Sequence, residues 1–396
     1  MNAASLRYAG RMAGVRLALF SDTFSPQVNG VARTLDRLTT ALRERGGEVL
    51  VFTTDEPGAH NAMDVVRSPG RAFPAYPQLR LSWPRQSAVM ARLREFQPTL
   101  VHAATEFGMG LAGRRAARAL DVPFVSSYHT SFTAYAAHYG MGLLARPGWS
   151  YLRWFHNGGR RTYCPTAAIV REVEAQGFER CAVWTRGVDG HRFSPRYRSA
   201  AFRTAIGAHD STLVAAYVGR LAAEKQVDVA LDAVRLASAA RPGAVRLLVV
   251  GDGPCDVPAR SRAPEGSTFT GRLEGAALSE AYASADVLLF PSTTDTFGNV
   301  MLEAMASGTP VIGADVAPTR EVLLPDRGWV APPGDAAAVA SLLTQLTDDR
   351  TPLHLRREAA LEHAAASTWD TVWDRLFDDY LTVQGSSPAA RLTGRS

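Results

Sequence analysis

Lysine, cysteine and long apolar runs are all scarce in this sequence of 396 residues. Only one of its 43 Lys and Arg residues is a lysine, Lys225, and the three cysteines, Cys164, Cys181 and Cys255, are widely separated. Such spacing fits neither a disulfide framework nor a zinc site. No apolar run approaches the roughly 20 residues of a membrane-spanning helix, and residues 1–14 lack the apolar stretch of a signal peptide. These absences favour a cytoplasmic protein.

The bulk composition describes a globular chain with a small excess of positive charge. Hydrophobic residues make up 46% of the sequence and charged residues 20%, and the formal net charge is +5. A length near 400 residues predicts roughly two domains of about 200 residues each. The charge permits nucleic acid, acidic lipid or a phosphate-bearing small molecule as a partner. The single lysine is compatible with chance or with a role that needs a compact point charge.

Short apolar runs alternate with helix-period segments along the chain, which is typical of βαβ units and parallel sheets. The pattern begins at Val15 and restarts at Leu213. The predicted strands are Val15–Phe20, Val49–Thr53, Leu100–His102, Phe124–Ser127, Leu213–Val218, Arg246–Val250, Val287–Phe290 and Pro310–Ile312. The predicted helices of the first half are Val31–Arg45, Met109–Leu120 and Thr166–Gln176.

The polar stretch before the second half predicts a linker, because it contains Pro195 and has no apolar period. Near the C-terminus, an apolar stripe at helical spacing predicts a helix that needs a surface to cover. The stripe consists of Trp369, Val372, Trp373, Leu376, Phe377 and Tyr380. The predicted organisation is an extension (1–14), a first domain (15–190), a linker (191–207), a second domain (208–366), a C-terminal helix (367–384) and a disordered tail (385–396).

The first motif, Ser21–Gly30, follows the first strand and leads into a helix. Unpaired amide N–H groups and the positive end of the helix dipole meet at such a position, which suits a phosphate. A single glycine is no dinucleotide-binding fingerprint. Taken alone, an ordinary strand-to-helix turn is the better explanation of the segment.

The second motif is Gly219-Arg220-Leu221-Ala222-Ala223-Glu224-Lys225, directly after the first strand of the second half. Open α/β sheets bind their ligands at the carboxyl ends of their strands. A guanidinium beside an ammonium at that edge can hold a diphosphate. The alternative is two solvated surface cations.

The third motif runs from Asp295 to Gly308 and follows the strand Val287–Phe290. Asp295 precedes a predicted helix that begins near Asn299, and Glu303 lies within that helix. Gly298 allows the backbone to approach a ligand closely, and the first helical N–H groups have no partner within the helix. The neighbours of Glu303 in the sequence are apolar. They argue against a position on a solvent-exposed helix face, where most glutamates lie.

These motifs together resemble the retaining glycosyltransferases of family 4 over nearly all of Val15 to Tyr380. Asp295 is a departure, since the family often has glutamate there. Further matching segments are Ser127-Tyr128-His129-Thr130, Arg186-Gly187-Val188-Asp189 and Val250-Gly251-Asp252-Gly253-Pro254. The resemblance implies an α/β GT-B fold, with two Rossmann-like domains facing across a cleft and a C-terminal helix packing back on the first domain.

The resemblance also implies a nucleotide-sugar donor site. Arg220 and Lys225 would bind the diphosphate, and Glu303 would bind the ribose. Asp295 would bind the transferred sugar, and His129 would lie near its reactive carbon. The other implied donor-binding residues are Gly30, Glu274, Phe297, Gly298, Asn299 and Val300, and the implied acceptor-side residues are Asn29, Glu106 and Tyr128.

The resemblance further implies a metal-independent reaction without cofactor, with GDP-mannose as donor and a lipid or glycan as acceptor. Transferases using UDP-sugars, glucosyl or sulfoquinovosyl, have similar segments and remain the alternative. Glu274 could accept from guanine N–H groups, although an exposed loop acid is an equally good interpretation. A non-catalytic sugar-binding protein would normally carry an export signal. A nucleic-acid partner is disfavoured, because the carboxylates of Asp295 and Glu303 would repel phosphates.

Two segments that mix basic and aromatic residues indicate an anionic membrane surface as a further partner, on the inner face of the cell membrane. First-domain loops and a buried aromatic helix explain them equally well. The first segment contains Arg71, Phe73, Tyr76, Leu79, Arg80, Leu81, Trp83, Arg85, Arg92 and Arg94. The second contains Arg146, Trp149, Tyr151, Arg153, Trp154, Phe155, Arg160 and Arg161.

Overall fold

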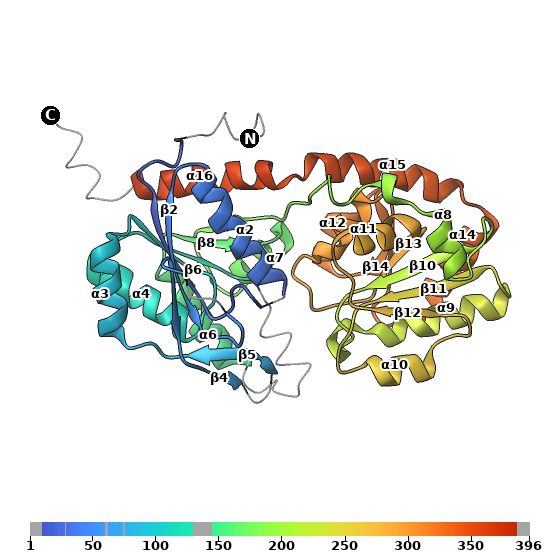
Figure 1. Cartoon of the computed structure of the whole chain (residues 1–396), viewed down its shortest axis with the longest axis horizontal. Coiled ribbons are helices and arrows are strands. Elements are labelled where there is room, and N and C mark those ends of the chain that lie inside the picture. Colours follow the sequence, from blue (N-terminus) through green and yellow to red (C-terminus); the bar gives the residue numbers. More distant parts are fainter. Residues whose placement is uncertain (1–9, 28, 60–61, 74–75, 130–144, 386–396) are drawn as a thin grey trace. The chain divides into compact units, whose positions relative to one another are not determined.

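The computed structural model describes residues 10–27, 29–59, 62–73, 76–129 and 145–385 (Figure 1). The chain divides into two compact units. Unit 1 comprises Met1–Thr185 and Val372–Ser396, and unit 2 comprises Arg186–Thr371. The tail predicted at 385–396 lies outside the described residues from 386 onward.

Unit 1 is built on a parallel sheet whose seven described strands have the order β3-β2-β1-β6-β7-β8-β9. Their bounds are β1 (Arg16–Ser21), β2 (Glu48–Thr54), β3 (Val65–Ser68), β6 (Leu100–Ala103), β7 (Phe124–Ser127), β8 (Arg161–Cys164) and β9 (Cys181–Val183). The helices are α2 (Gly30–Glu44), α3 (Gln86–Phe96), α4 (Gly108–Leu120), α6 (Ala145–Asn157) and α7 (Ala167–Ala175). An antiparallel hairpin of β4 (Gly70–Phe73) and β5 (Tyr76–Ser82) completes the unit.

The central strands of unit 1, β1, β2, β6 and β7, form because their apolar runs are buried on both faces. Residues 17–21 of β1 are all buried, and Phe20 stacks on Phe52 of β2 with ring centroids 4.5 Å apart. The predicted strands and helices of this half are confirmed within one or two residues at each end. The predicted extension contacts the rest of unit 1 at residue 12, since Met12 is buried and its N–H donates to the carbonyl of Arg45.

Helix α16 (Trp369–Gly385) packs its apolar stripe against unit 1 from Val372 onward, which confirms the predicted C-terminal helix. The Tyr380 hydroxyl lies 2.6 Å from Nδ1 of the buried His102. Asp379 accepts bonds from the Arg161 guanidinium at 2.8 Å and from the Tyr163 hydroxyl at 2.7 Å. These contacts fix β6 and β8 to the helix.

Unit 2 contains a second parallel sheet, in which the described strands have the order β12-β11-β10-β13-β14-β15. Their bounds are β10 (Leu213–Val218), β11 (Val245–Val250), β12 (Thr268–Gly271), β13 (Val287–Phe290), β14 (Val311–Ala314) and β15 (Gly328–Ala331). The helices are α8 (Ala200–Ala205), α9 (Val227–Ala240), α10 (Asp256–Arg262), α11 (Gly275–Ser284), α12 (Asn299–Ala306), α13 (Ala317–Leu323), α14 (Ala336–Asp348) and α15 (Thr351–Ala366), with short 3₁₀ turns η2 (Pro195–Tyr197) and η3 (Ala223–Lys225).

The stretch predicted as a linker, residues 191–207, lies within unit 2 in the structure. Phe193 and Ile206 are part of the hydrophobic core, and α8 packs against α11. The Arg203 guanidinium is buried and binds Asp286 at 3.0 Å. The division between the units falls at Thr185 instead, because these scattered apolar side chains are buried although they follow no helix or strand period.

Candidate active site

Two predicted site residues meet at the place where the strand order of unit 2 reverses. The chain runs outward from β10 through β11 to β12, then returns to β13 on the other side of β10. Lys225 follows β10 and Asp295 follows β13, and the Lys225 Nζ donates to Asp295 Oδ1 at 2.7 Å. A crevice at the carboxyl ends of such strands is where open α/β sheets bind ligands. The ion pair therefore joins the two sides of the expected ligand site.

Arg220 lies beside this pair, held by a residue to which sequence reasoning assigned no role. Its guanidinium forms an ion pair with the carboxylate of Glu224, whose side chain is 1% exposed. The Tyr217 hydroxyl donates to the Arg220 carbonyl at 3.0 Å. The acid four positions after the arginine was visible in the sequence, but the two side chains meet through the loop after β10 and the turn η3, and not on a helix face. Arg220 and Lys225 are called the cation pair below.

The cation pair keeps Asp295 ionised. Burial by itself would raise the pKa of Asp295, but the Lys225 ammonium, through its charge and its hydrogen bond, holds that pKa below its ordinary value. Arg220 acts in the same direction. The site therefore presents an ionised Asp295 carboxylate beside the two basic side chains.

Helix α12 carries the remaining residues of the third motif. Gly298 precedes it with φ +81°, and a Cβ there would lie 2.6 Å from the Phe290 ring, so glycine is required. Asn299 and Val300, in the first turn, are half-buried. One turn further on, Oε2 of the half-buried Glu303 accepts a bond from the hydroxyl of the buried Tyr282 at 2.8 Å. Tyr282 is a second support that sequence reasoning missed.

Two other predicted donor residues lie in different surroundings. The Phe297 side chain is part of the hydrophobic core of unit 2, so any contact with a donor would come from its backbone. Glu274 is exposed at the start of α11 and forms an ion pair with Arg272 at 2.5 Å. The structure thus brings together Arg220, Lys225 and Asp295, and leaves Glu274 on the surface.

In unit 1, the two residues predicted around the first helix lie at its N-terminus. The Asn29 side chain accepts from the Ala32 N–H at 2.8 Å, which makes it the N-cap of α2. Gly30 is the first residue of α2, and both residues are exposed. The neighbouring Thr23 hydroxyl accepts from the Asn29 amide at 2.8 Å. The Asn29 side chain thus caps the helix, and Gly30 is exposed at its first position.

The other predicted residues of unit 1 follow β6 and β7. The His129 ring contacts Trp184, with centroids 5.1 Å apart, and is 8% exposed. Tyr128 is fully buried among apolar side chains. Glu106 is 2% exposed, and its Oε1 lies 3.4 Å from Nε2 of the buried His156. The side chains of Glu106 and Tyr128, predicted to face the acceptor, therefore point into the protein.

Comparison with known proteins decides the family. The model of Glycosyltransferase Family 4 matches residues 28–192, and that of Glycosyl transferases group 1 matches residues 212–349. A GDP-mannose-dependent alpha-mannosyltransferase of Mycobacterium tuberculosis is 37% identical over 94% of this chain and 98% of its own length. This chain belongs to glycosyltransferase family 4.

More distant relatives of this glycosyltransferase agree with its fold. Sulfoquinovosyl transferase SQD2 of Arabidopsis thaliana is 32% identical over 89% of this chain and 71% of its own length. The solved structure of a sucrose-phosphate synthase from Thermosynechococcus elongatus superimposes with a TM-score of 0.78 at 19% identity, covering 94% of this chain and all of that one. The glycosyltransferase WaaG superimposes with a TM-score of 0.69 at 18% identity, covering 92% and 98%. The fold is GT-B, as the resemblance implied.

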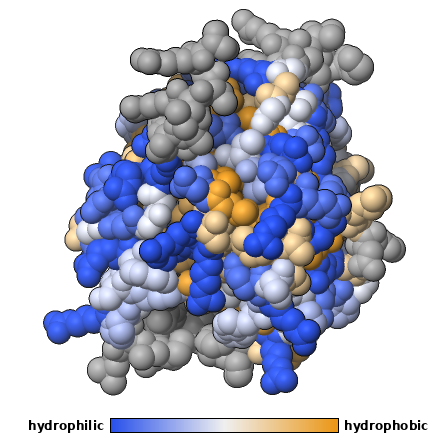
Figure 2. Space-filling model, turned by 90° about the vertical axis from the view of Figure 1, so that its left-hand side faces the viewer, coloured by the Kyte–Doolittle hydropathy of each residue, from blue (hydrophilic) through white to orange (hydrophobic). Residues whose placement is uncertain are grey.

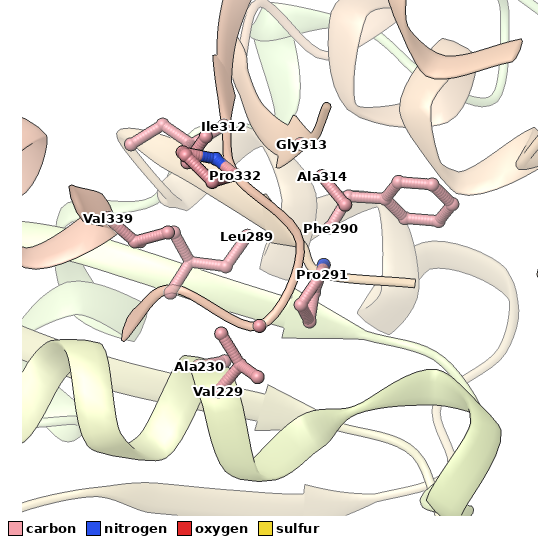
Figure 3. Close-up of a pocket in the computed structure, with 12 residues that line it drawn as sticks. Val229, Ala230, Leu289, Phe290, Pro291, Ile312, Gly313, Ala314, Pro332 and Val339 are labelled. Atoms are coloured by element: carbon pink, nitrogen blue, oxygen red, sulfur yellow. The ribbon is translucent and has the colours of Figure 1, made fainter. Parts of the chain in front are cut away.

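A small pocket in unit 2 of the glycosyltransferase is lined by none of the predicted site residues (Figure 3). Its volume is about 10 Å³, roughly the space of a single water molecule. It is lined by Val229, Ala230, Leu289, Phe290, Pro291, Ile312, Gly313, Ala314, Ala331, Pro332, Gly334 and Val339. An apolar pocket of this size cannot hold a nucleotide sugar.

Asp22, directly after β1, is a buried carboxylate that sequence reasoning did not single out. Its Oδ2 accepts from the Thr105 hydroxyl at 2.6 Å, and its Oδ1 accepts from the Met109 N–H at 3.3 Å. Burial raises the pKa of Asp22 to about 6, against a lowering by these hydrogen bonds. Asp22 therefore ties β1 to the start of α4 at a cost in stability when it is ionised.

This glycosyltransferase is expected to lose stability through Asp22 as the pH rises from about 4 through about 6. The folded-state pKa lies above the ordinary 3.8, so the stabilisation is complete below pH 3.8 and is lost as the pH passes about 6. The loss is on the order of 1–3 kcal/mol. Asn can keep both contacts, because the Thr105 hydroxyl also accepts hydrogen bonds.

Urea unfolding at pH 5 and pH 7.5 tests the Asp22 prediction. Asp22→Asn should gain free energy of unfolding relative to the wild type at the higher pH. Glu95→Gln, at an exposed carboxylate on α3, is the control. It should change the free energy of unfolding by the same amount at both pH values. An Asp22→Asn difference that is independent of pH would contradict the prediction.

Proposed function

We propose that this chain transfers mannose from GDP-mannose to a lipid or glycan acceptor, with retention of configuration and without a metal ion. The observation that carries the proposal is the Lys225–Asp295 ion pair beside Arg220 at the strand reversal of unit 2. The donor follows from relatives that cover nearly the whole chain, including the GDP-mannose-dependent alpha-mannosyltransferases of Mycobacterium tuberculosis and Corynebacterium glutamicum.

The cation pair would stabilise the leaving nucleoside diphosphate. In the transfer, the bond between the sugar C1 and the phosphate oxygen breaks, and a bond from the acceptor oxygen to C1 forms on the same face. The acceptor proton passes to the departing phosphate. Negative charge builds on the diphosphate, where fixed cations lower the barrier. An ammonium has three N–H donors, so the bond from Lys225 to Asp295 is compatible with contacts to phosphate.

The carboxylates would orient the two ends of the donor. Asp295 is ionised and faces the cation pair, so it can accept bonds from the hydroxyls of the transferred sugar. Glu303 is held through Tyr282 and can accept from the ribose hydroxyls with its other oxygen. His129, from unit 1, would contact the sugar near its reactive carbon.

Incubating the purified protein with a panel of GDP- and UDP-sugars tests the proposal. Release of GDP from GDP-mannose is the expected result, with an α-linked product by NMR and an unchanged rate in EDTA. A β-linked product would overturn retention, and loss of activity in EDTA would overturn metal independence. If no nucleotide sugar binds or turns over, the proposed activity is wrong.

UDP-sugar transfer is the second candidate, and the position of Glu274 favours keeping it. The carboxylate that could read guanine is exposed and paired with Arg272. The relatives also include an alpha-monoglucosyldiacylglycerol synthase of Streptococcus pneumoniae, 30% identical over 75% of this chain and 70% of its own length. Turnover of a UDP-sugar without turnover of GDP-mannose would establish this candidate.

A lipid-linked acceptor would bring the protein to an anionic membrane surface. Among the described residues, no helix has the length and apolar character needed to cross a membrane. Trp83 directly follows β5 in the chain, and its backbone lies beside Gly108, the first residue of α4. Its side chain is 69% exposed. Trp154 on α6 is also exposed, with the Arg114 guanidinium of α4 4.0 Å from its ring centroid. Tryptophan and arginine together suit a lipid headgroup region.

Only part of the two predicted segments supports the membrane interpretation. Arg85, Arg146 and Arg153 are exposed like the two tryptophans. Phe155 is buried, and Arg161 binds Asp379 of α16. The side chains of Phe73, Tyr76 and Leu79 lie outside the described ones. Figure 2 shows the side of unit 1 with α3 and α4 as mainly hydrophilic around a small hydrophobic area, which suits peripheral binding.

Replacing both Trp83 and Trp154 with serine is expected to weaken binding to anionic phosphatidylglycerol vesicles by at least tenfold, because two aromatic side chains no longer enter the headgroup region. Vesicle co-sedimentation measures the effect. Leu355→Ser removes an exposed apolar side chain of unit 2 and is the control. If the double variant and the wild type bind the vesicles equally, the proposed membrane surface is wrong.

A further inference from the structure

A buried carboxylate lies directly behind the cation pair. The Glu224 side chain is 1% exposed, whereas the Arg220 side chain that it binds is 26% exposed. The acidic end of this ion pair therefore faces the interior of unit 2, and the cationic end faces outward. A buried acid with an outward-facing cation is the arrangement that presents the cation to a ligand.

The backbone around Glu224 is fixed from both sides of the strand reversal. The Thr294 hydroxyl, next to Asp295, donates to the Glu224 carbonyl at 3.4 Å. The Tyr217 hydroxyl donates to the Arg220 carbonyl at 3.0 Å. Residue 224 thus has little freedom, and its carboxylate sets the direction of the guanidinium.

The charges around the strand reversal are balanced pairwise. Arg220 is paired with Glu224, and Lys225 is paired with Asp295. Without Glu224, the Arg220 guanidinium would lose this carboxylate while the Lys225 ammonium stayed nearby, since both cations act on Asp295. A long arginine side chain also loses substantial rotamer freedom when a ligand fixes it. Pairing with Glu224 balances the charge of Arg220 and restricts its rotamers before a ligand binds.

We propose that Glu224 is a positioning residue for donor binding, which holds the Arg220 guanidinium where the diphosphate of the nucleotide sugar binds. The inference rests on the proposed function, and it assigns Glu224 no contact with the donor. A guanidinium has five N–H donors, so the bond to Glu224 leaves others that can contact phosphate.

A double-mutant cycle tests the inference. Glu224→Gln keeps the size of the side chain and removes its charge. We expect it to lower kcat/KM for the nucleotide sugar by roughly 10- to 100-fold, because a guanidinium displaced by about 1 Å no longer meets the phosphate correctly. In an Arg220→Met background, Glu224→Gln should have no further effect, because Glu224 acts through Arg220. Glu224→Asp should recover part of the lost activity.

The control is Asp256→Asn, which removes the acid of an exposed Arg260–Asp256 pair with the same spacing in unit 2 and should leave turnover unchanged. Titration of GDP and UDP by calorimetry, with thermal unfolding of every variant, completes the experiment. An equal loss from Glu224→Gln in both backgrounds would reduce Glu224 to a structural role. If the wild type turns over nucleotide sugars and Glu224→Gln does so equally well, the positioning role is wrong and the proposed function stands. A wild-type protein that neither binds nor turns over nucleotide sugars would overturn the proposed function.

Discussion

Replacing Lys225 with methionine is expected to lower kcat/KM for the nucleotide sugar by roughly 10²- to 10³-fold, the loss typical of removing one fixed donor to a developing anion. Methionine keeps most of the length of the side chain and removes its charge. The change also leaves the Asp295 carboxylate without the ammonium that now lies 2.7 Å away. Nucleotide release under steady-state conditions measures the effect.

Lys225→Arg gives the sharper version of this experiment. A planar guanidinium is larger than an ammonium and distributes its donors differently, and the Lys225 side chain is only 20% exposed. We therefore expect a clear loss of turnover although the charge is kept. Arg235→Met, at an exposed cation of α9, is the control and should be neutral. Near-normal turnover of Lys225→Arg would show that the reaction does not require a lysine at position 225.

Gly251→Ala is expected to lower the free energy of unfolding by on the order of 3 kcal/mol or more, because it combines overpacking with an unfavourable backbone conformation. Gly251 follows β11 with φ +139°, and a Cβ there would lie 1.9 Å from the carbonyl oxygen of Gly219. Gly219 directly precedes Arg220, so the absence of a side chain at Gly251 lets the loops after β10 and β11 meet beside the cation pair. Urea unfolding of the full chain measures the loss.

Gly243→Ala separates the two contributions to this loss. Gly243 also lies in unit 2 and has φ +72°, but no heavy atom lies within 4 Å of the Cβ position. Its substitution should therefore cost only the backbone strain, about 1 kcal/mol. Similar losses for Gly243→Ala and Gly251→Ala would refute the importance of the close approach.

The predicted strands were most accurate where a continuous apolar run is buried on both faces. Phe124–Ser127, Leu213–Val218 and Val287–Phe290 agree with β7, β10 and β13 at both ends. Strand β8 was missed because it begins at Arg161, whose charge is satisfied by Asp379, 218 residues further along the chain. No local pattern contains such a partner.

The sequence by itself determined the two-domain α/β organisation and the strand ends that carry Arg220, Lys225 and Asp295, because apolar period and turn residues act over short distances. Only the tertiary structure decided that Lys225 binds Asp295, 70 residues away, and that Glu224 and Tyr282 are buried supports. It also placed Phe297 in the core and Glu274 on the surface. These outcomes depend on strand order and burial, which bring distant residues together and which no spacing along the chain encodes.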